Sequence, residues 1–235
     1  ADLAMARGDL ATAEAGHLEA LAAFERRAAS DPHNAGWQRD LSVSHNKIGD
    51  VRWAQGDLAG ALAAYDAGLA IRDELAASDP ANAGWQRDLS VSHNKIGDVR
   101  REQGDLAGAL AAYEASHAIF EELAASDPDN AGWRRDLSVS HNKIGDVRRD
   151  QGDLAGALAA YEAGLAIAEE LAASDSDNAG WQRDLSVSHD RIGDVRRAQG
   201  DLAGALAAYE AGLAMRDQLA ASDPDNAGWR RDLSV

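Results

Sequence analysis

One sequence unit recurs along the chain at a fixed spacing, and this period constrains the fold more than any other feature. Tryptophans lie in steps of 48 residues, at Trp37, Trp85, Trp133, Trp181 and Trp229. The letters around Trp85, GWQRDLSVSHNKIGDVR, return with at most two changes around Trp37, Trp133 and Trp181. A period of roughly 20 to 50 residues is typical of repeat arrays. The sequence therefore predicts a solenoid in which each unit packs only on its neighbours.

The period also sets the expected boundaries of the units. It gives a partial repeat at 1–34, full repeats at 35–82, 83–130, 131–178 and 179–226, and the start of a further repeat at 227–235. Both ends cut through a repeat, so we expect a piece of a longer protein or the ordered part of one.

Each unit carries the pattern of two helices. In the third full repeat, apolar residues recur at helical spacing from Trp133 to Val147, which predicts an amphipathic helix of about twenty residues. Gly152 then suits a helix C-terminus, and Asp153 suits the N-cap of a second helix from Leu154 to about Ala173. Asn130 and its equivalents are expected to cap the first helices. The sequence therefore predicts an all-α protein built from antiparallel helix pairs.

The order of small and large residues in the unit resembles a known family. The second full repeat reads HNKIGDVR from His93, then runs from Ala109 to Tyr113, and later reaches Pro128. This is similar to the tetratricopeptide repeat, whose signature is W-x₂-L-G-x₂-Y, then A-x₃-F, then P. His, Ile, Arg and Tyr replace four of its large residues, and each helix is longer by about two turns. The resemblance implies a right-handed α-solenoid, a TPR-like superhelix, whose concave groove holds peptides or proteins.

The resemblance also implies which residues line this groove. Three rows lie at i, i+4 and i+7 of each first helix and share one face. The first row is Asn46, Asn94, Asn142 and Asp190, the second is Asp50, Asp98, Asp146 and Asp194, and the third is Trp53, Arg101, Arg149 and Arg197. The amides could bond a ligand's backbone, the aspartates favour a basic or mixed-charge ligand, and Trp53 could be an anchor. Alternatively, these side chains solvate the helix face and pair between neighbouring repeats.

Composition excludes several classes of partner. The formal net charge of −17 disfavours binding to nucleic acid and to anionic membranes. There is no cysteine, which excludes disulfides and thiol chemistry. The most apolar stretch, Leu154 to Ala173, carries three glutamates and does not read as a membrane span. We therefore expect a soluble array, cytoplasmic by default.

A row of histidines suggests a metal-binding site as one hypothesis. His45, His93, His141 and His189 lie near the aspartates in sequence. Packed helices are about 8 to 10 Å apart, whereas ligands of one zinc must each come within about 2.1 Å of it. We expect a partly buried packing role for these histidines, with no metal and no cofactor. Every Ser, His and Asp recurs in the same setting, so no unique catalytic constellation is expected and the chain is predicted not to be an enzyme.

The functional prediction is a protein- or peptide-binding scaffold. Similar bacterial arrays often sit beside signalling or effector domains, so the resemblance implies a segment of a larger signalling or regulatory protein. The alternative is a structural array that self-associates end to end. Residues 1 to 7 resemble the end of a first helix and residues 229–235 the start of one, and uncapped repeat arrays expose adhesive ends.

Overall fold

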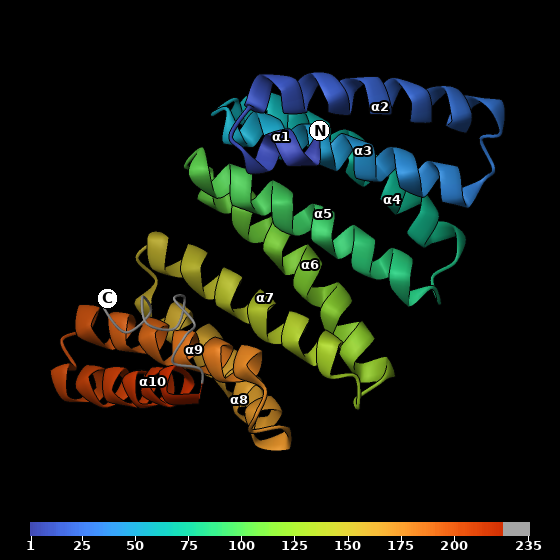
Figure 1. The fold of residues 1–235 in the computed structure, drawn as a ribbon. Helices are drawn as coiled ribbons and strands as arrows, with labels where there is room; N and C mark the ends of the chain where they lie inside the picture. Colours follow the sequence, from blue (N-terminus) through green and yellow to red (C-terminus); the bar gives the residue numbers. More distant parts are fainter. Residues whose placement is uncertain (223–235) are drawn as a thin grey trace. The chain divides into compact units, whose positions relative to one another are not determined.

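The computed structural model describes residues 1–222, which form ten α-helices and no strand (Figure 1). The helices are α1 (Asp2–Ala6), α2 (Leu10–Ser30), α3 (Ala35–Ala54), α4 (Leu58–Ser78), α5 (Ala83–Glu102), α6 (Leu106–Ser126), α7 (Ala131–Asp150), α8 (Leu154–Ser174), α9 (Ala179–Ala198) and α10 (Leu202–Ser222). This confirms the predicted all-α fold of repeated helix pairs. The predicted partial repeat at 227–235 lies outside the described residues.

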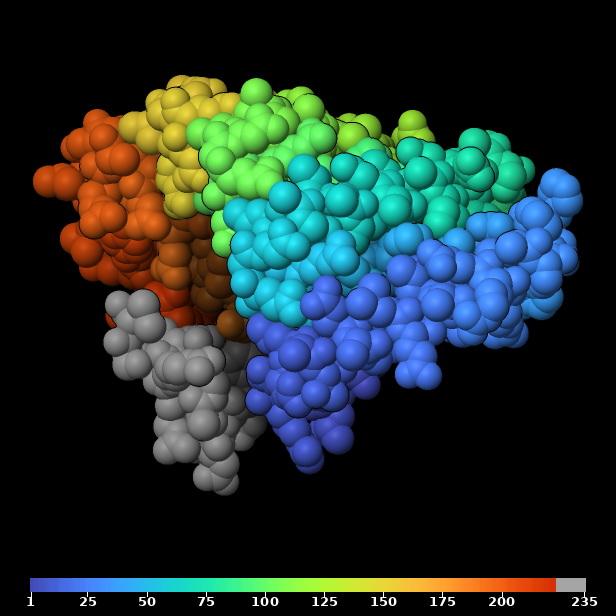
Figure 2. Space-filling view, turned by 90° about the horizontal axis from the view of Figure 1, so that it is seen from above, coloured from blue at the N-terminus to red at the C-terminus, as the bar shows by residue number. Residues whose placement is uncertain are grey.

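The chain divides into two compact units, Ala1–Ile119 and a second that begins at Phe120. In the first unit, α2 packs on α3, α3 on α4 and α4 on α5. Figure 2 shows this unit, coloured blue to green, as a continuous surface in which the colours follow one another in chain order. In the second unit, α7 packs on α8, α8 on α9 and α9 on α10. Within each unit these helices thus contact their neighbours in sequence, as a repeat array requires.

Side-chain caps fix where the helices begin. The Asn130 Oδ1 accepts a hydrogen bond from the backbone N–H of Trp133 at 3.2 Å, and Asp153 Oδ1 accepts one from the N–H of Gly156 at 2.9 Å. The same two caps recur in the other described repeats, through Asn34, Asn82 and Asn178 and through Asp57, Asp105 and Asp201. Each cap satisfies a backbone donor that the helix leaves unpaired. The predicted roles of Asn130 and Asp153 are confirmed.

A glycine with positive φ closes each first helix. Gly152 has a φ of 82°, and its equivalents Gly56, Gly104 and Gly200 lie within the same region. Only glycine adopts this conformation without strain, so the residue ends the helix and lets the chain reverse. The prediction for Gly152 is therefore confirmed.

The core lies between consecutive helix pairs. In the second unit, the fully buried Tyr161 of α8 packs with Ile192 and Val195 of α9. In the first unit, Tyr65 of α4 packs in the same way with Ile96 and Val99 of α5. In both cases the tyrosine ring of a second helix is covered by the first helix of the next repeat.

A glycine in each first helix makes room for this ring. A Cβ added at Gly145 would lie 2.5 Å from Tyr161 Cε1, and one added at Gly49 would lie 2.4 Å from Tyr65 Cε1. Real Cβ atoms do not approach carbon so closely, so glycine here permits the close contact of the two helices of a pair.

Serines occupy buried positions of the first helices. The Ser90 hydroxyl donates to the Arg87 carbonyl at 2.8 Å within α5, and the Ser138 hydroxyl donates to the Gly164 carbonyl of α8 at 2.8 Å. Because these hydroxyls are satisfied by backbone carbonyls, serine serves as a small core residue without leaving a buried polar group unpaired.

Candidate functional site

The exposed face of the first helices carries four recurring side chains. On α3 these are Arg39, Val43, Lys47 and Asp50, at helical spacings that place them on one side. The valine of this row is partly exposed in each first helix and reaches 37% exposure at Val139. The face therefore combines a small apolar row with charges of both signs.

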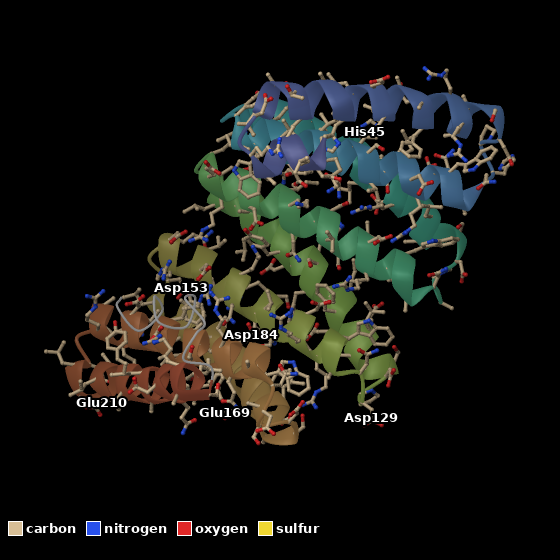
Figure 3. All side chains as sticks on the ribbon, viewed as in Figure 1. His45, Asp129, Asp153, Glu169, Asp184 and Glu210 are labelled. Atoms are coloured by element: carbon tan, nitrogen blue, oxygen red, sulfur yellow. The ribbon has the colours of Figure 1, made fainter. Side chains whose placement is uncertain are left out.

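Ion pairs connect the first helices of consecutive repeats at one end of this face. In the first unit, Arg39 Nε donates to Asp88 Oδ2 at 2.5 Å. In the second unit, Arg135 of α7 pairs with Asp184 of α9, which is labelled in Figure 3. Both pairs are partly exposed, so each adds only modestly to stability.

The predicted aspartate row forms a second set of links. Asp50 accepts from Tyr65 Oη at 2.7 Å and from Lys95 Nζ at 2.6 Å. Burial and then Asp50 raise the pKa of the Tyr65 phenol well above its ordinary range, so the phenol stays a hydrogen-bond donor. One carboxylate thus joins its own helix pair to the next first helix.

The other aspartates repeat this arrangement in part. Asp146 accepts from Tyr161 Oη at 2.6 Å and from Arg191 Nε at 3.2 Å. The remaining bonds of the row are Tyr113 Oη to Asp98 at 2.5 Å, Tyr209 Oη to Asp194 at 2.7 Å, and Arg197 Nη2 to Asp194 at 3.5 Å. The aspartates therefore form hydrogen bonds and ion pairs with other residues of the array. For Asp50 and Asp146 this agrees with the alternative that these side chains pair between neighbouring repeats.

The side chains of the predicted asparagine row point toward the second helix of their own pair. They do not point toward the exposed face that carries Val43 and its equivalents. Asn46 is 6% exposed and Asn142 is 8% exposed. With its amide oxygen turned toward Arg72, Asn46 accepts from Nη1 at 2.8 Å and Nη2 at 3.1 Å. Asn94 is half-buried with its Oδ1 buried, and Asp190 pairs with Arg216.

This placement differs from the expectation that the asparagines contact a ligand. Three residues along an α-helix rotate a side chain by about 300°, so Asn46 lies about 60° around the helix from Val43. That rotation is enough to move the amide from the open face into the contact between α3 and α4.

The third predicted row is mixed in its placement. Trp53 packs against the buried cluster around Tyr65, and its indole N–H donates to Glu102 of α5. Arg101 is half-exposed, Arg149 lies 3.7 Å from Asp150, and Arg197 is exposed. Trp53 thus links two consecutive repeats. The arginines lie at the border of the exposed face that carries Val43 and its equivalents.

The charge of the chain is divided unevenly between the two kinds of helix. Helix α7 contains five basic and three acidic residues, whereas α8 contains three glutamates and no basic residue. Helices α5 and α6 show the same contrast. The strong negative net charge therefore comes from the second helices and the loops, and the first helices are slightly basic.

The histidine row is partly buried. His45, labelled in Figure 3, lies on α3, and its Cβ would be 3.4 Å from a Cβ added at Gly68 of α4. Burial lowers the pKa of His45, His93 and His189 below the ordinary value of 6.5. Within residues 1–222, no group of three or more His, Cys, Asp or Glu side chains is placed to hold a metal ion.

The lowered pKa values of these histidines predict that the folded chain loses stability in mild acid. The unfolded chain binds the imidazole proton more strongly than the folded one, because the folded pKa is lowered. Stability is therefore complete above pH 6.5 and falls as the pH drops through 6.5 toward the lowered folded pKa values. Thermal unfolding between about pH 7.5 and 5 measures this effect. A His45→Gln/His93→Gln variant should show a flatter pH dependence, and an unchanged slope would contradict the assignment.

No described helix has both the length and the apolar character needed to cross a membrane.

Two rows on the exposed face of the first helices were not predicted from the sequence. They are the row of Val43, Val91, Val139 and Val187 and the row of Lys47, Lys95, Lys143 and Arg191. Both could have been found from the sequence, because they recur in every full repeat seven and three residues before the aspartate row.

Comparison with known proteins gives the fold. No protein-family model matches the chain, and no curated protein is similar to it in sequence. A putative kinesin light chain of Podosopora anserina with nearly identical TPR-like repeats superposes with a TM-score of 0.68 at 13% identity, over 94% of this chain and 92% of that one. MamA gives a TM-score of 0.54 at 15% identity, over 93% and 95% of the two chains. BtubC (BKLC) from P. vanneervenii gives 0.52 at 17%, over 89% and 92%. The chain has the fold of a TPR-like array of helical repeats.

Proposed function

We propose that this chain is a non-catalytic scaffold for protein interactions. The repeats are those at 35–82, 83–130, 131–178 and 179–226, and within each unit their first helices form a surface that binds a polypeptide segment of a larger assembly. The observation that carries the proposal is the partly exposed valine row, which lies on the open face and outside the buried clusters. Repeat arrays commonly use such extended faces for binding.

The ligand of this surface is a mixed-charge segment. The valine row supplies apolar contacts, and it is flanked by the links from Asp50 to Lys95 and from Asp146 to Arg191. A strongly basic ligand would have to displace these cations from the aspartates. The slight excess of basic residues on the first helices also disfavours it. A segment with both charges can complement the carboxylates together with Arg101 in the first unit, or together with Arg149 and Arg197 in the second.

The TPR-like neighbours support the scaffold role at the level of fold. We further propose that the array is a regulatory or signalling part of a cytoplasmic protein.

A change at Val139 tests the proposed surface. The probes are peptides selected from a random library for binding to the parent chain. We expect Val139→Asp to weaken their binding about tenfold or more, because the substitution removes an apolar contact and adds an unpaired charge. Ala159→Asp, on the exposed side of α8, is the matched control and should leave binding unchanged. Isothermal titration with circular dichroism measures affinity and folding together. If both variants bind like the parent, the first-helix face is not the binding surface.

End-to-end self-association is a second candidate, supported by exposed leucines at one end of the second unit. Analytical ultracentrifugation over a range of concentrations tests it, since self-association makes the apparent mass rise with concentration.

A further inference from the structure

A pocket of about 180 Å³ opens at the loop end of the helix pair α3 and α4. It lies between the loop before α3, the first turn of α3 and the last two turns of α4. Its walls are apolar at Ile71 and Leu75 and polar at Gln38, Glu74 and Ser78. Helix α2 packs on α3 and α5 packs on α4, so the pocket stays open with both neighbouring helices in place.

The pocket carries a negative charge without a basic partner. Among the described residues, no hydrogen bond or ion pair engages the Glu74 carboxylate. Only His33, of the residues that line the pocket, can carry a positive charge, and it forms no ion pair with Glu74 in the described part of the chain. The last turn of α4 contains no basic residue, and the free carbonyls and the dipole of a helix C-terminus favour a cation. The pocket is therefore suited to a cationic group.

The third full repeat places an arginine at the equivalent position. Arg134 of α7 stands where Gln38 stands on α3, two periods of 48 residues later, and Glu170 of α8 stands where Glu74 does. Nη2 of Arg134 donates to Oε2 of Glu170. Arg134 lies in the first turn of α7, so its guanidinium is accommodated even beside a helix N-terminus, which alone disfavours cations. A helix pair of this chain thus accepts a guanidinium on this glutamate.

Gln38 does not take the place of that guanidinium in the first full repeat. Its Nε2 donates to the Pro32 carbonyl at 3.1 Å, which holds the amide against the loop and leaves Glu74 open. A water molecule takes about 30 Å³ of liquid volume, so a pocket of about 180 Å³ has room for several waters. The same space admits a planar guanidinium and part of an aliphatic chain.

We propose that this pocket binds a guanidinium group, that of an arginine side chain or of a free guanidinium compound. The guanidinium pairs with Glu74, as Arg134 does with Glu170, and an attached methylene chain lies on Ile71 and Leu75. Arginine is preferred to lysine because its planar fork of donors matches a carboxylate. The site uses α4 and the loop before α3, so it is separate from the first-helix face of the proposed function.

Two probes test the pocket on the whole chain, N-acetylarginine amide and guanidinium chloride at concentrations too low to unfold proteins. We expect saturable NMR shifts of the backbone amides at 32–38 and 71–78 with both. Tighter binding of the arginine derivative assigns the site to an arginine side chain, because only that probe has a methylene chain to contact Ile71 and Leu75. Equal affinities assign it to a free guanidinium compound. N-acetyllysine amide should bind about fivefold more weakly than the arginine derivative.

Two substitutions should close the site. Glu74→Gln should weaken binding of N-acetylarginine amide about fivefold, the upper range for a partly exposed pair. Gln38→Arg should weaken it as much, because the chain then supplies its own guanidinium, as at Arg134. The matched control is Asp73→Asn, which removes the same charge from a neighbouring exposed residue outside the pocket and should leave the affinity unchanged. Circular dichroism verifies that each variant stays folded.

Four results would each overturn the proposal. They are the absence of saturable shifts at the pocket, equal affinities for the arginine and lysine derivatives, equal losses with Glu74→Gln and Asp73→Asn, and a Gln38→Arg chain that binds like the parent. Because none of these variants changes the valine row, the outcome is independent of the peptide binding expected on the first helices.

Discussion

Replacing Gly49 with alanine is expected to lower the free energy of unfolding of the first unit by about 2 to 3 kcal/mol. In an ordinary helix interior the same change raises stability by about 1 kcal/mol. Here the new Cβ would lie 2.4 Å from Cε1 of Tyr65, a ring with no exposed surface. The ring cannot move away without breaking its contacts with α5 and its hydrogen bond to Asp50. Steric strain therefore outweighs helix propensity.

The control for this prediction lies in the same helix. At Gly36, an added Cβ would meet only Asn34 Oδ1, at an ordinary 3.4 Å. Gly36→Ala should thus leave stability unchanged or raise it by up to about 1 kcal/mol. Urea unfolding followed by circular dichroism measures both variants. Equal effects of the two substitutions would show that the close contact of α3 with Tyr65 is not a constraint.

Arg72→Ala is expected to cost the first unit about 3 kcal/mol. Arg72 is 4% exposed, and its guanidinium donates to the Asp88 carbonyl at 2.8 Å and to Ser92 Oγ at 2.8 Å. It also bonds Ser42 Oγ at 3.1 Å and the amide oxygen of Asn46. Truncation leaves several buried polar groups without this donor and opens a cavity beside them. The loss is large because the affected groups cannot turn to water.

Arg216 provides the comparison, since it occupies the same position of the last described repeat. Its side chain is more exposed and pairs with Asp190. We expect Arg216→Ala to cost at most about 1 kcal/mol, as for other solvent-accessible pairs. Hydrogen exchange, read separately in α4 and α10, measures both variants. If Arg72→Ala and Arg216→Ala lower the free energy of unfolding equally, burial of the arginine does not determine its contribution to stability.

The sequence predicts the helices well because local signals recur in every unit. Asn130, Gly152 and Asp153 mark helix ends through bonds and dihedral angles that involve only a few neighbouring residues. Such signals do not depend on which elements pack together. Repetition strengthens them further, since the same cap has to fit at each copy.

Side-chain direction within a face was harder to predict. The asparagine row lies at the edge between the open face and the second helix, where a rotation of about 60° decides between solvent and burial. Sequence alone does not show that Arg72 provides a partner for Asn46. Buried serines such as Ser90 are also missed by hydrophobic patterns, because a backbone carbonyl satisfies the hydroxyl.

The near-identity of the repeats has a consequence for how the chain folds. The buried contacts of Tyr65 and Tyr161 involve equivalent residues, so the first helix of one repeat matches the second helix of several others. Side-chain recognition therefore cannot select the correct neighbour. The selection comes from chain connectivity, because the short turn at Gly152 and Asp153 keeps α8 close to α7 from the moment both form. Shortening these turns until α8 can no longer fold back on α7 should therefore favour exchange of helices between molecules, and the array would then form swapped oligomers while every local contact stayed native.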